Sequence, residues 1–274
     1  MDIFAGAAVI AANKNKVPVL LHESNSYPGK AIQMLAKKSD TILVSFKDAQ
    51  NSIKNCKNVV FTGTPVKIKK QSYSIEKRND IINQIGLSKD KPIVLIFGGS
   101  QGAQKINEAI ISIIQNKLNK NYGLLWATGP KQYDLIKEQL EKNHINIDKI
   151  DNTKIVPYIY NMEEVENVCD LVVARSGAMT ITEISNLGKP SILIPLPNVS
   201  NDHQMYNARV LENIGGAKII TNDTLNGEIL NNTINSIIND KSVCEEMSKN
   251  ALKVSTTDVE DKIYREIKKL VKGK

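Results

Sequence analysis

The residues best suited to chemistry form a glycine-rich turn, Gly98-Gly99-Ser100-Gln101-Gly102-Ala103. The turn follows an apolar run at residues 92–97 and precedes a helical pattern at residues 103–118, which predicts a strand, a turn and a helix. Glycine permits a positive φ and a close backbone approach, and the N–H groups and dipole of a helix start attract anions. A phosphate site and a plain tight turn both fit, since the spacing matches neither G-x-G-x-x-G nor a P-loop.

A second segment suited to chemistry is Arg175-Ser-Gly-Ala-Met-Thr-Ile-Thr-Glu183, which follows an apolar run at residues 170–174. Glu183 could accept two hydrogen bonds from a ribose diol, and the N–H groups of residues 178–182 could face a phosphate. The spacing Thr180-x-x-Glu183 is also that of a capping box, in which the glutamate reaches back to its own helix start. The sequence therefore leaves a nucleotide site and a helix cap as alternatives.

Composition excludes several classes of function. The chain has 274 residues, 41% of them hydrophobic and 24% charged, which is typical of a globular protein. Its net charge of +7 comes almost entirely from lysine, whereas base reading and bidentate phosphate binding favour arginine, so nucleic acid is not expected as a partner. The three cysteines and three histidines show neither C-x-x-C nor H-E-x-x-H spacing, so we expect no disulfide framework and no metal site.

The apolar runs alternate with helical patterns along the whole chain. Runs rich in Ile, Val and Leu indicate parallel strands that are covered on both faces, which predicts a doubly wound α/β fold. A polar, lysine-rich linker at residues 67–74 separates three of these runs from the other six. The predicted strands are residues 17–21, 41–45, 59–62, 92–97, 123–128, 154–158, 170–174, 191–195 and 217–220.

Both ends of the chain are predicted to be helical. Residues 3–12 match a signal peptide in length but follow Asp2 rather than a basic segment, so we expect a buried helix there. No segment reaches the roughly 18 apolar residues that a membrane span needs. Residues 256–274 have apolar side chains at helical spacing, acidic residues near the start and lysines near the end, as the helix dipole favours. A docked terminal helix and a membrane anchor both fit that pattern.

Taken together, the motifs resemble the MurG family of peptidoglycan glycosyltransferases, and the resemblance covers nearly all of the chain. The matching pieces, in order, are Pro18-Val-Leu-Leu-His-Glu-Ser-Asn25, Gly63-Thr-Pro-Val-Lys67, Gly98-Gly-Ser-Gln-Gly-Ala103, Tyr158-Ile-Tyr-Asn-Met162, Arg175-Ser-Gly-Ala-Met-Thr-Ile-Thr-Glu183, Gly188-Lys-Pro190 and Asp202-His-Gln-Met-Tyr-Asn-Ala208.

The resemblance implies a GT-B-like α/β fold of two doubly wound parallel-sheet domains. Residues 1–66 would form a partial N-terminal, acceptor-side domain, residues 67–252 a UDP-sugar-binding domain, and residues 253–274 a helix that packs back towards the N-terminal domain. The implied reaction moves N-acetylglucosamine from UDP to the 4-hydroxyl of undecaprenyl-diphospho-N-acetylmuramyl-pentapeptide, with inversion and without a metal or cofactor. The implied partners are UDP-GlcNAc, the lipid-linked acceptor and an anionic membrane surface, with the enzyme cytoplasmic and peripheral on the inner face of the cell membrane.

The resemblance also implies a role for each site residue. Ser100 would contact the pyrophosphate, Ile159 the uracil through its backbone, Glu183 the ribose, and Gln204 the sugar hydroxyls or phosphate, while Asn25 would face the donor from the other domain. The implied substrate-binding residues are Asn25, Lys67, Ser100, Ile159, Ala178, Met179, Thr180, Ile181, Thr182, Glu183 and Gln204.

The chain departs from the family pattern at two places. Thr64-Pro-Val-Lys67 stands where the family usually has Asn-Pro-Val-Arg, so a point charge replaces a bidentate phosphate contact. The family's Gly-Gly-Thr-Gly-Gly-His loop, whose histidine is its candidate base, has no counterpart, which suggests a truncated or differently started chain and leaves Asn25 or His22 for a catalytic role. The alternatives are a catalytically silent UDP-sugar-binding fragment, a UDP-GlcNAc 2-epimerase and a glycolipid glycosyltransferase.

Overall fold

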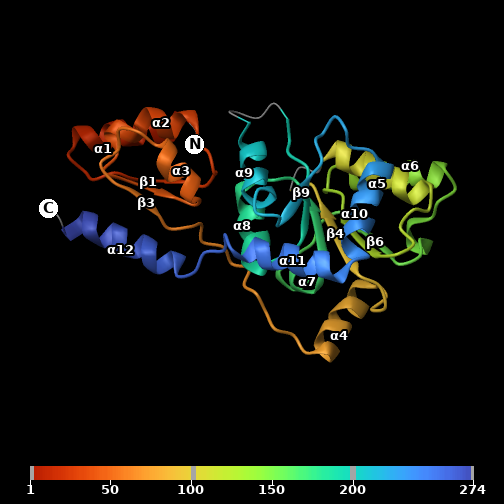
Figure 1. Cartoon of the computed structure of the whole chain (residues 1–274). Coiled ribbons are helices and arrows are strands. Elements are labelled where there is room, and N and C mark those ends of the chain that lie inside the picture. Colours follow the sequence, from red (N-terminus) through yellow and green to blue (C-terminus); the bar gives the residue numbers. More distant parts are fainter. Residues whose placement is uncertain (1–2, 100–102, 198–201, 273–274) are drawn as a thin grey trace.

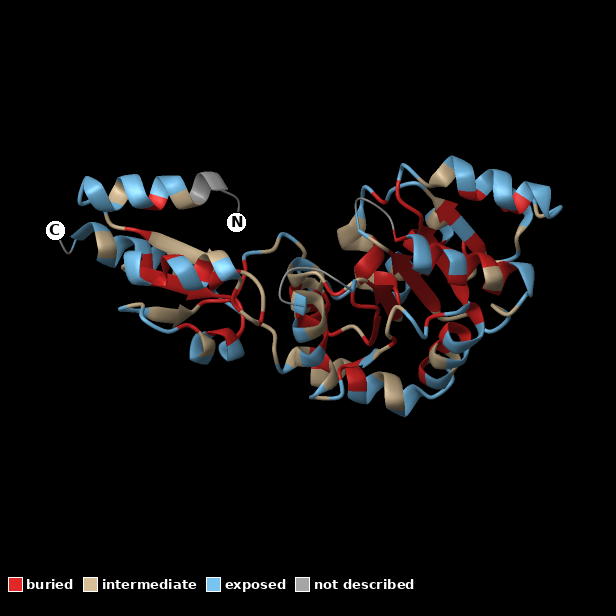
Figure 2. Cartoon of the chain, turned by 90° about the horizontal axis from the view of Figure 1, so that it is seen from above, coloured by how far each residue is buried: buried red, intermediate tan, exposed pale blue. Residues whose placement is uncertain are grey.

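A computed structural model describes residues 3–99, 103–197 and 202–272, with the side chains of residues 3–5 left out. The described chain forms two units, each built on a parallel sheet (Figure 1). In both units the buried residues concentrate on the strands, and the exposed ones lie on the outward faces of the helices (Figure 2). The predicted α/β class with two parallel sheets is therefore confirmed.

The smaller unit has a sheet in the order β1-β2-β3, in which β1 and β3 are the edges. The apolar run of β2 is fully buried because helices and neighbouring strands cover it on all sides. The elements are α1 (Ile3–Lys14), β1 (Leu20–Glu23), α2 (Lys30–Leu35), the 3₁₀ turn η1 (Ala36–Lys38), β2 (Thr41–Val44), α3 (Lys47–Ser52) and β3 (Val59–Phe61).

The larger unit has a six-stranded sheet in the order β6-β5-β4-β7-β8-β9. Its strands and the helices that connect them are α4 (Ile75–Ile85), β4 (Ile93–Phe97), α5 (Gln104–Gln115), β5 (Gly123–Ala127), α6 (Tyr133–Lys142), η2 (Ile147–Lys149), β6 (Thr153–Val156), α7 (Met162–Val168), β7 (Leu171–Ala174), α8 (Ala178–Leu187), β8 (Ser191–Leu193), α9 (His203–Glu212), β9 (Ala217–Ile219), α10 (Gly227–Ile238) and α11 (Lys241–Leu252).

Alternate residues of the central strands face two different cores. Val94 and Ile96 of β4 point into a cluster formed with α5, α6 and α10, whereas Ile93 and Leu95 point into one formed with α4, α7, α8 and α9. Helices on both faces explain why these strands show no alternation of polar and apolar residues. All nine predicted strands are present, with boundaries that differ by up to three residues.

The last helix, α12 (Val259–Lys272), returns to the smaller unit (Figure 1). Asn58 Nδ2, just before β3, donates to Glu266 Oε2 on α12 at 3.4 Å. The described terminal helix thus contacts the smaller unit, which favours the docked-helix interpretation. No helix within the described ranges has the length and apolar character to cross a bilayer.

The prediction for the first helix was only partly right. Residues 3–14 are helical, but among the described side chains of α1 only Val9 is buried, and Ile10 is 42% exposed. The described part of the helix is rich in apolar residues, whereas its contacts are a small cluster in which Val9 packs with Val19, just before β1, and Leu35 of α2. An apolar composition therefore did not determine how much of the helix is covered.

Candidate functional site

The strand ends of the larger unit surround a pocket of about 490 Å³. Strands β4, β7 and β8 are neighbours and parallel, so their carboxyl ends lie at one edge of the sheet, where open α/β sheets bind ligands. The lining residues are Phe97, Gly98, Gly99, Ala103, Gln104, Lys105, Arg175, Gly177, Thr180, Leu196, Pro197, Gln204 and Asn222. The two segments that the sequence analysis placed at strand-to-helix turns thus meet in one cavity.

The first wall of this pocket is the turn after β4. Gly99 has a φ of +83°, and a Cβ on Gly98 would lie 2.4 Å from the Cβ of Ala103 and 2.6 Å from its backbone nitrogen. Only glycine therefore permits the chain to fold this closely onto the start of α5. Ser100, predicted to contact a pyrophosphate, lies outside the described residues.

The second wall is the start of α8, where Gly177 occupies the N-cap position and makes no side-chain capping bond. The helix begins at Ala178, so Glu183 lies in its second turn and not three residues after the cap. The capping-box alternative is therefore wrong. The N–H groups of Ala178, Met179 and Thr180, in the first turn, have no carbonyl of the same helix four residues earlier to which they could donate. This helix start therefore presents free donors and the positive end of the helix dipole at the pocket.

Arg175 is a pocket residue that sequence reasoning did not assign to the site. Its guanidinium donates to the carbonyl oxygens of Ile194 (3.0 Å) and Pro195 (3.2 Å) after β8 and to Asn222 Oδ1 (2.9 Å) after β9. Partial burial lowers the pKa of Arg175 from its ordinary value. The available signal was an arginine placed directly after a buried strand in a chain where this residue is rare.

Gln204 lines the same pocket from the first turn of α9. Its side-chain Oε1 accepts a hydrogen bond from the backbone N–H of Leu196 at 2.9 Å, and its carbonyl accepts one from Ser176 Oγ at 2.7 Å. These bonds join the loop after β8 to the loop after β7. The predicted residue therefore lies at the pocket, with its amide nitrogen making no bond to any described residue.

Asn25 reaches the larger unit from the loop after β1. Its Oδ1 accepts a hydrogen bond from Asn207 Nδ2 at 3.1 Å, while the buried Glu23 carboxylate accepts bonds from the Asn25 backbone and side chain. Asn207 is 1% exposed and also accepts from Ser26 N at 2.9 Å and donates to the carbonyl of Ser176 at 3.2 Å. Asn25 therefore contacts α9 of the larger unit, and its role facing the donor stays a prediction. Asn207 is the bridging residue that sequence reasoning did not assign to the site.

Glu183 is half-buried on α8 and does not line the pocket. Burial raises its pKa above the ordinary value for a glutamate. Glu166 on α7 interacts with it electrostatically and is itself fully buried, with neither carboxylate oxygen bonded to any described group. Burial, and then the charge of Glu183, raise the pKa of Glu166 to about 8.

The remaining predicted residues are placed around the pocket rather than in it. Ile159 follows β6, where it lines a separate hollow with Tyr158 and Tyr160. Lys67 is exposed on the linker. Met179 is 45% exposed, whereas Ile181 and Thr182 are buried, and the Ile181 N–H donates to the carbonyl of Gly177. Across the described residues, no group of three or more His, Cys, Asp or Glu side chains could hold a metal ion.

Comparison with known proteins agrees with this geometry. Residues 93–263 match the family model "Glycosyltransferase family 28 C-terminal domain". The solved structures similar to the whole chain include Acinetobacter baumannii MurG, with a TM-score of 0.77, 24% identity, and coverage of 98% of this chain and 72% of that one. Staphylococcus aureus MnaA in complex with UDP has a TM-score of 0.69 at 16% identity and covers 97% and 73%. Both support the GT-B-like fold.

Curated relatives are more similar in sequence. One from Ruminiclostridium cellulolyticum is 39% identical over 266 residues, 97% of this chain and 71% of the relative. One from Leuconostoc citreum is 40% identical over 261 residues, 95% of this chain and 69% of the relative. Both are named UDP-N-acetylglucosamine--N-acetylmuramyl-(pentapeptide) pyrophosphoryl-undecaprenol N-acetylglucosamine transferase. The chain therefore belongs to the MurG family of glycosyltransferases.

Proposed function

We propose that the pocket at the ends of β4, β7 and β8 binds UDP-N-acetylglucosamine, and that the chain transfers its sugar to a lipid-linked muramyl-pentapeptide acceptor in peptidoglycan synthesis. The observation that carries this proposal is the convergence of two helix starts, of α5 and α8, with the Arg175 guanidinium on one cavity. Oriented N–H groups and a fixed cation suit a diphosphate. The relatives' printed names supply the sugar and the acceptor.

The donor would place its diphosphate in the pocket and extend beyond it towards Glu183 and Ile159, which do not line the pocket. Its diphosphate would lie between the Gly98 turn and the start of α8, with the Lys67 ammonium as a further point charge. The ribose diol would bond to Glu183, and the uracil would contact the backbone of Ile159. Gln204 and Asn25 would face the sugar. Gln204, in the first turn of α9, is bonded to the loop after β8, and Asn25 is bonded to Asn207 of α9.

The reaction would then be a single displacement without a metal. The oxygen of the acceptor's 4-hydroxyl bonds to the anomeric carbon as the bond from that carbon to the diphosphate oxygen breaks, and the hydroxyl proton passes to a general base or to water. Negative charge develops on the departing UDP. Donors that already point at that charge stabilise it without reorganisation, an effect worth about 3–4 kcal/mol per donor in other enzymes.

Transfer and binding are tested by separate measurements. We expect UDP and UDP-N-acetylglucosamine to bind in calorimetric titration and to raise the melting temperature, because ligands that bind only the folded state stabilise it. We expect UDP release to require the lipid-linked acceptor. Binding without acceptor-dependent release would identify a UDP-sugar-binding protein, and no heat at millimolar UDP would refute the donor site.

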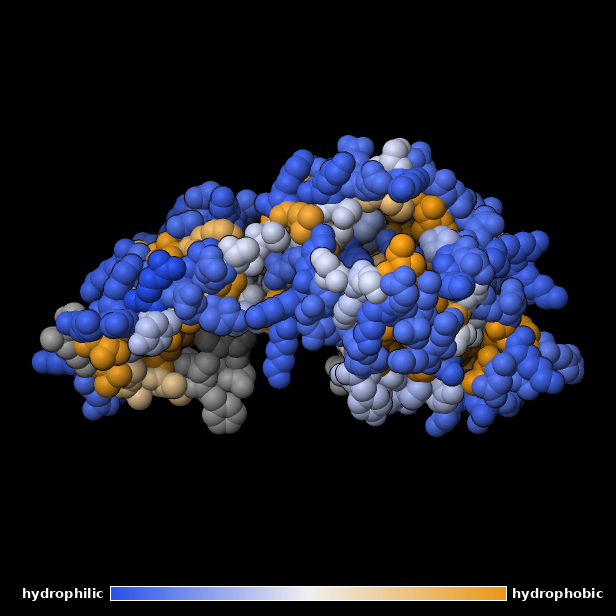
Figure 3. Space-filling view, turned by 90° about the horizontal axis from the view of Figure 1, so that it is seen from below, coloured by the Kyte–Doolittle hydropathy of each residue, from blue (hydrophilic) through white to orange (hydrophobic). Residues whose placement is uncertain are grey.

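A peripheral position on an anionic membrane is part of the proposal, because the acceptor is lipid-linked. Of the 274 residues, 36 are lysine or arginine and 29 are aspartate or glutamate, which gives a net charge of +7. Hydrophilic side chains cover most of the face seen in Figure 3, with apolar side chains in small groups among them. Each lysine near an anionic bilayer contributes about 1 kcal/mol of attraction. The proposed location is the cytoplasmic face of the cell membrane.

A further inference from the structure

The chain passes between the two units twice, and the two passages touch. Residues 62–74 lead from β3 to α4, and residues 253–258 lead from α11 to α12 (Figure 1). Gly63 in the first passage has a φ of +86°, and a Cβ built on it would lie 2.5 Å from Thr256 Oγ1 and 2.8 Å from Thr256 Cβ in the second. The passages therefore meet at a contact that tolerates no side chain at residue 63.

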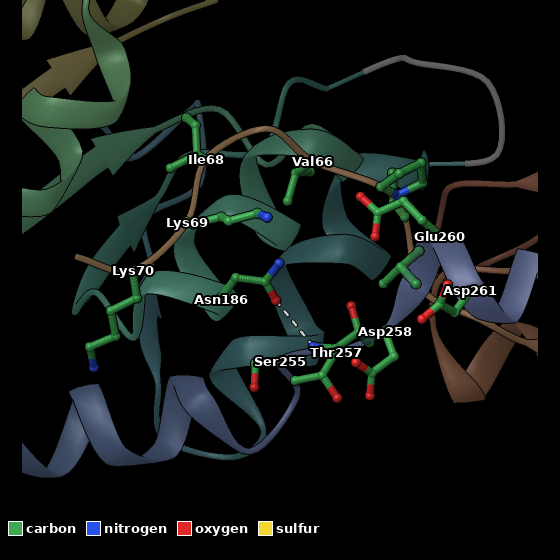
Figure 4. A pocket seen from close by; sticks show the side chains of 14 residues that line it. Val66, Ile68, Lys69, Lys70, Asn186, Ser255, Thr257, Asp258, Glu260 and Asp261 are labelled. Carbon is green, nitrogen blue, oxygen red and sulfur yellow. Dashed lines mark hydrogen bonds between the residues drawn. The ribbon is translucent and has the colours of Figure 1, made fainter.

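Each side of this contact is bonded to a segment of the proposed site. The Gly63 carbonyl accepts a hydrogen bond from His22 Nε2 at 3.1 Å, and His22 lies in β1, three residues before Asn25. The Thr256 N–H donates to Asn186 Oδ1 at 3.1 Å (Figure 4). Asn186 lies in the last turn of α8, the helix whose first turn faces the donor pocket. A continuous path of contacts thus runs from α8 to the loop that carries Asn25.

The contact has solvent-accessible space beside it. A pocket of about 490 Å³ lies between the two passages, lined by residues of both, with the side chains of Lys69 and Glu260 extending into it (Figure 4). Further along, the first passage is bonded to α7 at Lys69 and Gln71. Before that anchor, the contact between Gly63 and Thr256 and the bond from Thr256 to Asn186 join the two passages to each other and to α8. The proposed donor pocket belongs to the larger unit, so a change in the contact between the passages would displace Asn25 against its bonds to Asn207, while leaving the walls of that pocket in place.

We propose that Thr256 is a positioning residue for sugar transfer, and that its contact with Gly63, together with the bonds of the Asn25 loop to Asn207, sets the orientation of that loop relative to the donor pocket. The part of this inference that concerns transfer rests on the proposed function. The part that concerns orientation does not, because it predicts a distance between the two units.

The test compares two glycines with the same backbone strain. Gly86 has a φ of +87°, nearly that of Gly63, but no described atom lies within 4 Å of a Cβ built there. Gly63→Ala and Gly86→Ala therefore share the strain of a positive φ, and only Gly63→Ala adds the clash with Thr256. We expect UDP affinity to stay within about twofold of wild type in both variants, and the transfer rate to fall at least tenfold in Gly63→Ala alone, a magnitude typical of a misplaced substrate contact.

Rescue separates positioning from a general loss of structure. The double variant Gly63→Ala/Thr256→Gly adds a methyl group at residue 63 and removes the threonine side chain that this methyl group would meet. Without the clash, transfer should recover to the level of Gly86→Ala. The single variant Thr256→Gly, which removes the contact without creating a clash, should lower kcat with little change in UDP affinity. If Gly63→Ala does not fold, the comparison of Thr256→Gly with wild type still tests the proposal.

Orientation is measured directly with spin labels on the two units. Met34→Cys on α2 and Leu135→Cys on α6 provide exposed positions, 79% and 66% accessible, in a background where Cys56 and Cys244 are replaced by serine. We expect the distance distribution to shift or broaden in Gly63→Ala and Thr256→Gly, and to match wild type in Gly86→Ala. Unchanged distances in folded Gly63→Ala and Thr256→Gly would overturn the proposal. If wild type transferred no sugar, the proposed function would fail while the distances would still decide the orientation.

Discussion

At the scale of single residues, Glu183 is the clearest candidate for a ligand contact. It is half-buried in the second turn of α8, its carboxylate makes no hydrogen bond to any described group, and it does not cap its helix. Its carboxylate is therefore available to accept hydrogen bonds from a ribose diol. Its role as a ribose contact stays a prediction.

We expect Glu183→Ala to weaken UDP binding by about tenfold or more, because a hydrogen bond to a charged group contributes about 1.5–3 kcal/mol. Inorganic pyrophosphate, which has no ribose, should bind both proteins equally. The measurement is competitive calorimetric titration of the two ligands. Equal losses of affinity for UDP and pyrophosphate would mean that Glu183 influences binding only by stabilising α8 and does not contact the ribose.

Glu166 should make the stability of the protein depend on pH. Its folded-state pKa of about 8 lies above the ordinary value of 4.5, so the folded protein binds this proton more tightly than the unfolded chain does. The stabilisation is complete below about pH 4.5 and is lost as the pH rises through about 8. One pKa unit corresponds to about 1.4 kcal/mol, so the loss over this range is on the order of a few kcal/mol.

The test is denaturant unfolding of Glu166→Gln and wild type from pH 5 to pH 9. The variant has no proton to lose at this position, so its stability relative to that of wild type should rise towards pH 9. Glu138→Gln, at an exposed position on α6, is the control and should leave the pH dependence unchanged. Parallel pH profiles for Glu166→Gln and wild type would contradict the prediction.

At the scale of elements, the site is built where strands stop and helices begin. The turns after β4 and β7 both contain glycine, but the two glycines differ in what surrounds them. A Cβ on Gly98 would meet the backbone of Ala103 at 2.6 Å, whereas the nearest atom to a Cβ on Gly177 is Thr180 Oγ1 at 3.9 Å. Only the first turn requires glycine for close packing.

We therefore expect Gly98→Ala to destabilise the protein by about 1–3 kcal/mol, as overpacking does in other proteins, and to weaken UDP binding. Gly177→Ala serves as its matched control, since the added methyl group meets only an ordinary van der Waals contact. Thermal unfolding and calorimetric titration of both variants give the comparison. The interpretation of the Gly98 turn fails if both variants lose stability to the same extent.

Arg175 acts between elements rather than within one. Its three hydrogen bonds join the end of β7 to the ends of β8 and β9, so the guanidinium holds together the strand ends that surround the pocket. A lysine could not make this planar set of bonds. The same side chain thus contributes structure and, under the proposed function, positive charge.

At the scale of the whole molecule, the described units are joined by the two chain passages, by Phe46, which follows β2 and packs in a core cluster of the larger unit, and by the loop after β1. The loop of residues 23–29 meets α9 through Asn207 and through the stacked rings of Tyr27 and Tyr206, whose centroids are 4.7 Å apart. The division into residues 1–66, 67–252 and 253–274 stays a prediction. It agrees with the position of the passages, since residues 62–74 and 253–258 contain no helix or strand.

Membrane attachment belongs to this scale, because it depends on the charge of the entire surface. We expect weak binding to vesicles that contain anionic lipid, and a loss of binding as salt rises, since screening shortens the range of the attraction to about 8 Å at physiological salt. Sedimentation with anionic and neutral vesicles at two salt concentrations measures it. Salt-independent binding, or equal binding to neutral vesicles, would argue against an electrostatic attachment.

The sequence by itself determined the fold class, because runs of branched aliphatic residues between helical patterns can be buried on both faces only in a parallel sheet. It also identified the two glycine turns, since the order strand, glycine, helix is a local property of the chain. The tertiary structure decided what these local patterns could not. Capping depends on where α8 begins, burial of α1 depends on how much sheet lies against it, and the joining of Arg175, Gln204 and Asn207 depends on strand order. These residues are distant in sequence and become neighbours only when β4, β7, β8 and α9 pack together.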